Sequence, residues 1–189
     1  IKKIPIWIKN SFNPAVGGTE ITYDRHGNGR GVKAITSIKG LSLVTLQGKG
    51  MIGVPGTAAK LFGALAEKSI NVMFISQASS EHNISFIVRK YDGVKTRNIL
   101  EKAFQIELLN KRIENIRVED DVVIIAVVGE GMEGTPGIAA KTFTSLAEKK
   151  VNIVAIAQGS SELNISIIIR EQDLISAVRS IHKAFLLGE

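Results

Sequence analysis

The sequence predicts an α+β protein built from two similar units, each with the strand and helix order βαββαβ. Three observations support this prediction. The chain has 189 residues and is 44% hydrophobic, which is enough for one or two domains with a packed core. Residues 48–89 and 129–170 carry the same amino acid at 25 of 42 positions when they are aligned without a gap. In each copy, apolar residues alternate in some segments and recur at helical spacing in others.

The first unit is predicted to begin with the alternating, strand-forming stretch LSLVTLQG. A helix follows, with Pro55 in its first turn and apolar residues at helical spacing to about Lys68. The four strands are expected at residues 41–48, 70–77, 83–90 and 113–119, and the second helix at residues 94–108. This is the ferredoxin-like order, in which both helices cover one face of an antiparallel sheet.

The second unit repeats this order from Val122, and its second helix is expected at residues 171–185. No segment for a fourth strand follows this helix in the sequence. The stretch VKAITSIKG precedes the first unit as IENIRVEDD precedes the second, so we expect Val32–Ile38 to complete the second sheet. The predicted organisation is a leading segment at residues 1–31, a first unit at 40–119, and a second unit at 32–39 with 120–189.

Composition excludes several classes of protein. The net charge is +6, but much of the excess lies in the first 40 residues, and no basic stripe with interleaved aromatics predicts nucleic-acid binding. The chain has no cysteine, which excludes a disulfide framework and a thiolate metal site. The longest apolar run, Val122–Val128, is far shorter than the roughly 20 residues of a membrane helix. The first residues lack a signal-peptide pattern, so a cytoplasmic protein is expected.

The repeat contains one glycine-rich stretch twice, GKGMIGVPGTAAKLF and GEGMEGTPGIAAKTF. Glycines let backbone N–H groups approach a ligand closely, and the N-terminus of the following helix favours an anion. Neither copy is a Walker loop, because no Gly-Lys-Ser/Thr follows, and the spacing does not fit a dinucleotide-binding fingerprint. The alternative is a tight turn that only needs glycine, and the glycines alone leave both interpretations open.

Two amides also recur in each copy. Asn71 and Asn152 are expected to open the second strand of each unit, and Gln77 and Gln158 to close it. A carboxylate on the glycine loop and an ammonium on strand carbonyls would together describe an α-amino acid, whose side-chain hydroxyl a glutamine amide could bind. The alternative is that these amides only form hydrogen bonds at strand ends.

No catalytic constellation is found. His26, His82 and His182 are unrelated in spacing. The acidic run Glu119–Asp121 is expected to form a turn between two strands. Glu81 and Glu162 recur, but no partner base recurs with them, and no nucleophile–base pair or metal-ligand spacing is present.

The duplicated segments GKGMIGVPGTAAKLFGALAEKSINVMFISQASSEHNISFIV and GEGMEGTPGIAAKTFTSLAEKKVNIVAIAQGSSELNISIII resemble the tandem ACT domains at the C-terminal end of aspartokinase. IPIWIKNSFNP, with Gly18-Thr19, is similar to the segment that ends the kinase domain of that family. The stretch NIVAIAQGSSELNIS is more similar to the threonine-responsive than to the lysine-responsive members, mainly because of the two glutamines.

The resemblance implies a parent enzyme that phosphorylates the β-carboxylate of aspartate with ATP. The kinase motif, a lysine followed by Phe-Gly-Gly, is absent, so this chain would be a regulatory region or subunit without catalytic residues, cofactor or metal. Implied partners are threonine, lysine less so, its own kinase domain and further copies of the chain. The implied effector contacts, with the working copy left open, are Met51, Gly53, Val54, Gly56, Thr57, Asn71, Val72, Gln77, Met132, Gly134, Thr135, Gly137, Ile138, Asn152, Ile153 and Gln158.

Two alternatives remain open at this point. The first is a non-catalytic ACT-type module whose sheet edges only drive oligomerisation. The second is the same regulatory region taken from a bifunctional aspartokinase–homoserine dehydrogenase. Amino-acid binding would separate the sensor from the oligomerisation module.

Overall fold

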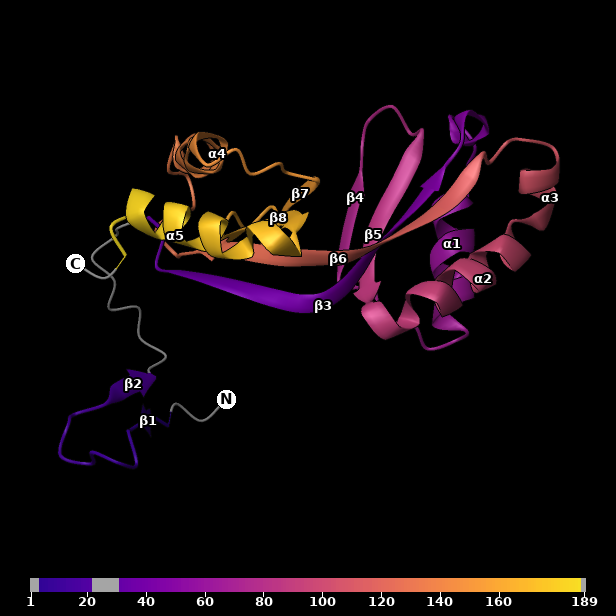
Figure 1. Cartoon of the computed structure of the whole chain (residues 1–189). Helices are drawn as coiled ribbons and strands as arrows, with labels where there is room; N and C mark the ends of the chain where they lie inside the picture. The colour runs from indigo at the N-terminus through magenta and orange to yellow at the C-terminus, as the bar shows by residue number, and fades with distance from the viewer. Residues whose placement is uncertain (1–3, 22–30, 188–189) are drawn as a thin grey trace. The chain divides into compact units, whose positions relative to one another are not determined.

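The computed structural model describes residues 4–21 and 31–187, and the chain divides into two compact units, Ile1–Arg30 and Gly31–Glu189. In the N-terminal part, Ile1–Arg30, β1 (Ile6–Ile8) pairs antiparallel with β2 (Thr19–Ile21) to form a small hairpin (Figure 1). Its apolar side chains, Trp7 and Phe12 among them, are exposed. His26 lies outside the described residues.

The larger part, Gly31–Glu189, contains both ACT-like units in an antiparallel six-stranded sheet with the order β4-β5-β3-β6-β8-β7. The strands are β3 (Ala34–Gln47), β4 (Phe74–Gln77), β5 (Asn83–Arg89), β6 (Asn115–Val128), β7 (Ala155–Gln158) and β8 (Asn164–Arg170). The helices are α1 (Thr57–Ala66), α2 (Gly93–Ala103), α3 (Gln105–Leu109), α4 (Ile138–Glu148) and α5 (Leu174–Ala184). Short 3-10 turns are η1 (Lys49–Met51), η2 (Lys90–Asp92) and η3 (Glu171–Asp173). None of the helices described here combines the length and apolar character needed to cross a membrane.

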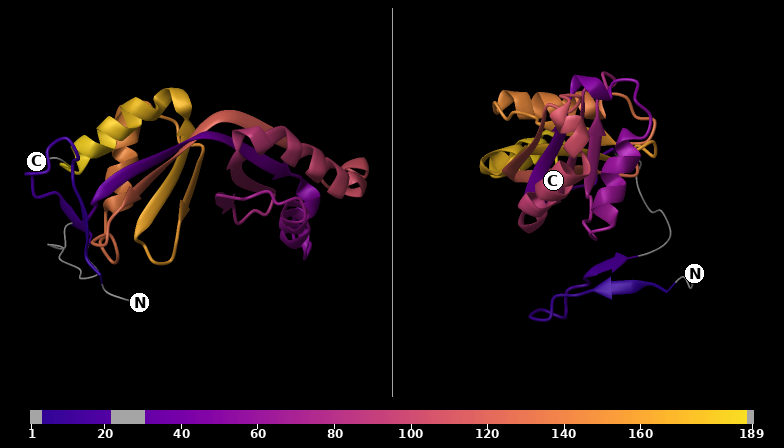
Figure 2. Two further views of the ribbon diagram at one scale, coloured as in Figure 1. Left: turned by 90° about the horizontal axis from the view of Figure 1, so that it is seen from below. Right: turned by 90° about the vertical axis from the view of Figure 1, so that its right-hand side faces the viewer.

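The two 14-residue strands β3 and β6 are shared between two halves of the sheet. The second half of β3, from Leu41, pairs with β5, and the second half of β6, from Val122, pairs with β8. In addition, the first half of each long strand pairs with the second half of the other. Each half therefore has the ferredoxin-like strand order, β4-β5-β3-β6 on one side and β3-β6-β8-β7 on the other. Figure 2 shows β3 and β6 running side by side through both halves. As expected for residues 32–38, Ala34–Ile38 pairs with Ile124–Val128, beside β8.

The prediction of separate strands on either side of residue 40, and again on either side of residue 121, was wrong. Gly40 and Asp121 lie within continuous strands, with left-handed φ angles of 70° and 58°. The register of β3 against β6 shifts between Ile38 and Ser42. A bulge turns a strand without ending its pairing, so Glu119–Asp121 is part of β6 and is not a turn.

Four element boundaries also differ from the predictions. Asn71 and Asn152 do not open strands, because β4 and β7 begin three residues later. Helix α1 begins at Thr57, which leaves Pro55 outside its first turn. The helix expected at residues 94–108 is interrupted at Phe104, whose φ and ψ of −103° and 24° are not helical, so that α2 and α3 are separate.

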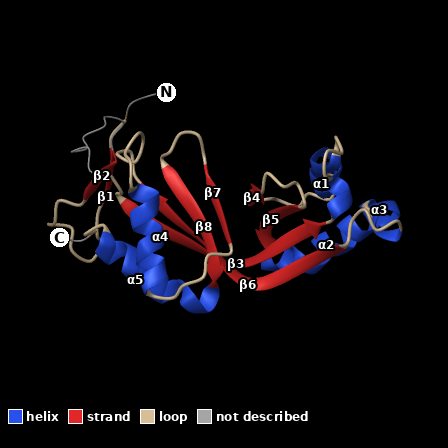
Figure 3. Cartoon of the chain, turned by 90° about the horizontal axis from the view of Figure 1, so that it is seen from above, coloured by secondary structure: helices blue, strands red, loops and turns tan. Residues whose placement is uncertain are grey.

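Each half buries its core between the sheet and one pair of helices, α1 with α2 and α4 with α5 (Figure 3). Alternation along the strands places a third apolar cluster on the other face of the sheet. For example, Val44 belongs to the core under α1 and α2, whereas its neighbour Leu43 belongs to this third cluster. Burying one large apolar side chain contributes about 1.5–3 kcal/mol, so these clusters fix the positions of the loops that join strands to helices.

Candidate functional site

The two glycine-rich stretches form loops of the same conformation, which we call the first loop (residues 48–56) and the second loop (residues 129–137). Gly53 and Gly56 have left-handed φ angles of 65° and 89°, and Gly134 and Gly137 have 62° and 90°. Only glycine adopts such angles at low cost. The duplicated sequence therefore produces a duplicated backbone shape.

Other glycines of the loops are required by close packing. A Cβ atom on Gly48 would lie 2.2 Å from the carbonyl oxygen of Arg112, and one on Gly129 would lie 2.2 Å from that of Gly31. In both units the approaching backbone belongs to the segment just before the fourth strand of that half. The structural interpretation of the glycines thus holds for these two, while the left-handed glycines shape the turn into the helix.

The start of the helix after each loop offers hydrogen-bond donors. Gly56 is the N-cap of α1 and Gly137 that of α4, and neither helix has a side-chain cap. The first N–H groups of an α-helix have no intrahelical partner, and the helix dipole favours an anion beside them. Within the first loop, by contrast, the N–H groups of Met51 and Val54 donate to Gly48 and Met51. A carboxylate would therefore bind most favourably at the helix N-terminus.

In the first half, a cavity of about 140 Å³ joins the loop to the end of β4. It is lined by residues that the sequence predicted, Met51, Val54, Gly56, Thr57 and Gln77, together with Ala58, Glu81 and Ile84. Its volume is well below the roughly 300–1,000 Å³ of sites for drug-sized ligands. The cavity thus brings Gln77, at the end of β4, together with the N-terminus of α1 around a space suited to a small ligand.

The structure does not bring all the remaining predicted residues to the loops, because Asn71, Val72, Asn152 and Ile153 precede the starts of β4 and β7, whereas the loops lie beside the ends of those strands. Asn71 and Asn152 are exposed and precede the edge strands. Four others contact the apolar cores: Met51 and Met132 are buried in them, and Val72 and Ile153 pack against them from the segments before β4 and β7.

The second loop differs from the first at two of the predicted positions, where Thr135 replaces Val54 and Ile138 replaces Thr57. Ile138, the first residue of α4, packs against the core of its half. Thr135 donates its hydroxyl to the carbonyl oxygen of Gly131 at 2.7 Å, and Gln158 ends β7 as Gln77 ends β4.

Sequence reasoning did not find a partner for Glu81 and Glu162. The Gly53 N–H donates to Oε2 of Glu81 at 2.7 Å, and the Gly134 N–H donates to Oε2 of Glu162 at 2.8 Å. The expected partner was a side-chain base, whereas the observed partner is a backbone amide. The available signal was the constant separation of 28 residues between glycine and glutamate in both copies.

The other side of the first loop faces a second hollow of about 170 Å³. Lys60 of α1 forms an ion pair with Glu107 of α3, and its Nζ lies 4.8 Å from the centre of the Phe104 ring. The hydrogen bond from Lys60 holds the pKa of the Glu107 carboxyl below its ordinary value, although partial burial opposes this. The ring contact recurs between Lys141 and Phe185 at 5.0 Å.

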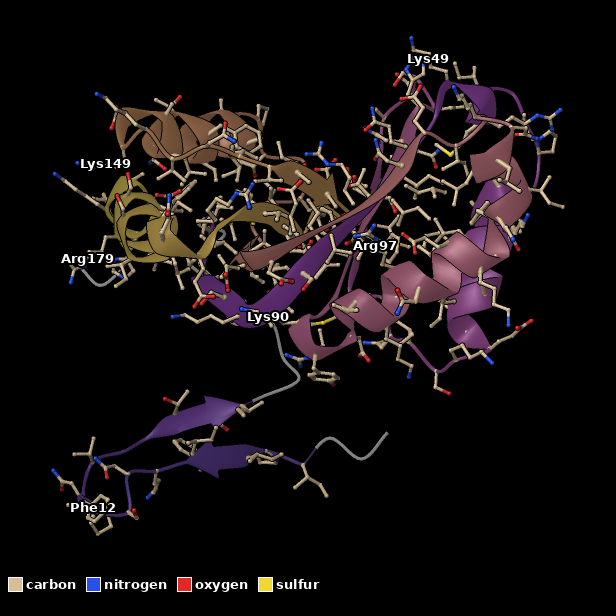
Figure 4. The ribbon with its side chains drawn as sticks, turned by 45° about the vertical axis from the view of Figure 1, so that its right-hand side comes forward. Phe12, Lys49, Lys90, Arg97, Lys149 and Arg179 are labelled. Carbon is tan, nitrogen blue, oxygen red and sulfur yellow. The ribbon has the colours of Figure 1, made fainter. Side chains whose placement is uncertain are left out.

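A larger hollow of about 1060 Å³ lies between α4 and α5, away from both loops. Its lining includes Lys149, which caps the C-terminus of α4, and Arg179 of α5 (Figure 4). It contains none of the effector contacts predicted from the sequence. Figure 4 also labels Lys49, which lies at the start of the first loop, just after β3, and is not part of this hollow.

Comparison with known proteins agrees with this geometry. The ACT domain family matches residues 44–104 and 125–185, which contain the two loops and the strands and helices around them. The bifunctional aspartokinase/homoserine dehydrogenase 1 of the Arabidopsis thaliana chloroplast is 40% identical over 190 residues, covering 98% of this chain and 21% of that protein. The chain thus spans about a fifth of the length of this relative and of its counterpart in Zea mays.

Solved structures show the same arrangement. Aspartate kinase from Clostridium acetobutylicum superposes with a TM-score of 0.83 at 29% identity, over 97% of this chain and 42% of that chain. The regulatory subunit of aspartate kinase from Thermus thermophilus has a TM-score of 0.68 at 29% identity, over 81% of this chain and 97% of that one. The chain belongs to the ACT domain family, and its paired ACT units match the regulatory region of aspartokinase.

Proposed function

We propose that this chain is the amino-acid-sensing region of an aspartokinase and that threonine is its effector. The observation that carries the proposal is the position of Gln77, whose side chain lines the same 140 Å³ cavity as the first loop and the start of α1. A glutamine amide and a helix N-terminus facing one small space are suited to a small ligand with a carboxylate and a neutral polar side chain.

The chemistry of the cavity favours threonine over lysine. The N-terminus of α1 would accept the α-carboxylate, as it would for any amino acid. The Gln77 amide can donate to or accept from a hydroxyl, but it carries no charge to balance a lysine ammonium. Glu81 also lines the cavity, and because its carboxylate accepts a hydrogen bond only from the neutral Gly53 N–H, its charge stays available to the α-ammonium group that every amino acid carries. The proposal extends to the equivalent residues of the second loop, including Gln158.

We also propose the place of this region in a larger enzyme. The Clostridium acetobutylicum kinase is described as an allosteric enzyme, and by analogy threonine would inhibit ATP-dependent phosphorylation of aspartate here. A ligand shifts a conformational equilibrium only by the difference in its affinity for the two states. Residues 1–31 would lead from the kinase domain, residues 40–119 form the first ACT unit, and residues 32–39 with 120–189 form the second. A homo-oligomeric, cytoplasmic enzyme remains the prediction.

Isothermal titration calorimetry tests the assignment directly. The purified chain is titrated with threonine, valine and lysine, because valine has the shape of threonine without its hydroxyl. We expect saturable heat with threonine, weaker binding of valine and the weakest binding of lysine. Absence of threonine heat, or tighter binding of lysine, would overturn the effector assignment. If none of the three binds, and no other amino acid does, the oligomerisation module becomes the better description.

A further inference from the structure

The turn between the second and third strands of each ACT unit is attached to the glycine loop at two points. In the first unit, the Gly48 N–H donates to the carbonyl oxygen of His82 at 2.9 Å, and the Gly53 N–H donates to Glu81 Oε2 at 2.7 Å. The turn itself is closed by a hydrogen bond from Glu81 N–H to Ala78 at 3.0 Å. Gln77 immediately precedes this turn, at the end of β4.

The second unit contains the same three contacts. The Gly129 N–H donates to Leu163 at 3.0 Å, the Gly134 N–H donates to Glu162 Oε2 at 2.8 Å, and the Glu162 N–H donates to Gly159 at 3.0 Å. Histidine in one copy is replaced by leucine in the other, because only its backbone is used. The glutamate is retained in both copies, because its side chain is used.

The left-handed glycines of each loop are not packed against other elements. A Cβ atom built on Gly53, Gly56, Gly134 or Gly137 would have no neighbour within 4 Å, so packing does not hold these positions. The base of each loop differs, since Gly48 and Gly129 lie directly against another backbone segment. The glutamate carboxylate is therefore a specific contact that restrains the tip of a loop whose base is already fixed.

We propose that Glu81 and Glu162 are positioning residues, which set the separation between the helix N-terminus at the end of the glycine loop and the glutamine that binds the effector side chain. This inference rests on the proposed function. Because the Gly53 N–H is already occupied, the effector carboxylate binds at the start of α1, and Glu81 acts through the loop. Without the hydrogen bond from Gly53 to Glu81, the carboxylate of threonine still binds at the helix, but its hydroxyl no longer lies within hydrogen-bond distance of Gln77.

Paired substitutions in calorimetry test this role. Glu81→Ala with Glu162→Ala should weaken threonine binding three- to tenfold, in the range expected for one lost hydrogen bond. The same variant should reduce the ratio of threonine to valine affinity at least threefold. Glu81→Gln with Glu162→Gln should restore most of that ratio, because an amide oxygen accepts from the same N–H. The control is Glu67→Ala with Glu148→Ala, a repeated pair exposed at the opposite ends of α1 and α4.

The outcomes separate this inference from the proposed function. An unchanged or increased threonine-to-valine ratio in the alanine variant, or a glutamine variant as weak as alanine, would overturn the positioning role while threonine binding stands. If the unaltered chain does not bind threonine, the effector assignment fails, and the positioning role fails with it. The contact itself is then judged separately by amide hydrogen exchange in the unliganded chain, where the Gly53 and Gly134 N–H groups should exchange several-fold faster in the alanine variant than in the control.

Discussion

Ser42 of β3 donates its hydroxyl to Oδ1 of Asp120 on β6 at 2.5 Å, at the point where both shared strands pass from one ACT unit to the other. Ser42 is fully buried, whereas Asp120 is exposed. The residues at the equivalent positions of the repeat are Val123 and Lys39, which do not reproduce this pair. The two units are therefore alike at their loops and different at their junction.

Replacing Ser42 with alanine should lower the free energy of unfolding by about 1 kcal/mol, because it removes a hydrogen bond to a carboxylate that water can partly replace. Urea unfolding followed by circular dichroism measures the change. Lys39→Ala is the control, because Lys39 occupies the position equivalent to Asp120 at the other end of the junction. Lys39 forms only an exposed ion pair with Glu171 at 3.7 Å, so the control should stay within about 0.5 kcal/mol. Equal effects of the two substitutions would contradict a specific role for the Ser42 contact.

Replacement by alanine should destabilise the chain at a glycine packed against another backbone segment and stabilise it at an exposed glycine within a helix. Gly48→Ala places a methyl group 2.2 Å from the backbone oxygen of Arg112, so the strand must shift, at a cost of about 1–3 kcal/mol. Gly63 is exposed inside α1 and has no atom within 4 Å of an added Cβ. Gly63→Ala should therefore stabilise the helix by about 0.5–1 kcal/mol. Thermal unfolding measures both, and a stabilising Gly48→Ala would show that our account of the loop base is wrong.

The Lys60–Glu107 pair predicts acid sensitivity in the first unit. Because the folded-state pKa of Glu107 lies below its ordinary value of 4.5, the pair contributes stability that is present above that value and lost as the pH falls through the folded pKa. A partly exposed ion pair contributes about 0.2–1 kcal/mol. Glu107→Gln should thus destabilise the chain near neutral pH and have little effect in strong acid. Urea unfolding from about pH 7 to pH 3 tests this, and a pH-independent difference would exclude the ionic contribution.

Local patterns predicted most of the elements, because alternation and helical spacing show which face of a strand or helix is buried. They did not predict that β3 and β6 continue through Gly40 and Asp121, since a left-handed residue has the same sequence signature in a bulge and in a turn. The repeat identified Gln77 and the first loop as candidates, and the structure places them around one cavity. The bond from Gly53 to Glu81 was not predicted, because side-chain contacts to backbone amides follow from three-dimensional proximity and leave no periodic pattern.

The edge strands predict that the chain associates with itself. β4 and β7 each have one partner strand in the sheet, and they contact each other where the Ser76 hydroxyl donates to the carbonyl oxygen of Ile156 at 3.3 Å, while the side chains of Ile75 and Ile156 are exposed. Unpaired strand edges with apolar side chains favour pairing with another chain, and a lysine at such an edge opposes it. Analytical ultracentrifugation at tens of micromolar should show a dimer or larger species, which Ile75→Lys with Ile156→Lys weakens at least tenfold. Ile175→Lys, at an exposed position on α5, is the control. A purely monomeric unaltered chain would contradict the prediction.

Replacing Gln77 and Gln158 with alanine tests the proposed effector most directly. The carboxylate and ammonium groups are common to all amino acids, so discrimination must come from the group that meets the side chain, and we propose that this group is Gln77, which lines the cavity. Losing one hydrogen bond at a site open to solvent costs about 0.5–1.5 kcal/mol, or roughly two- to tenfold in affinity. Each single substitution should weaken threonine binding at its own loop, and the double substitution should weaken both sites. Valine binding should change little, since valine has no hydroxyl to lose.

Both glutamines end exposed edge strands, so the melting temperature of the unliganded chain should stay nearly constant. Equal losses of threonine and valine affinity would show that the glutamines support the site without selecting the effector.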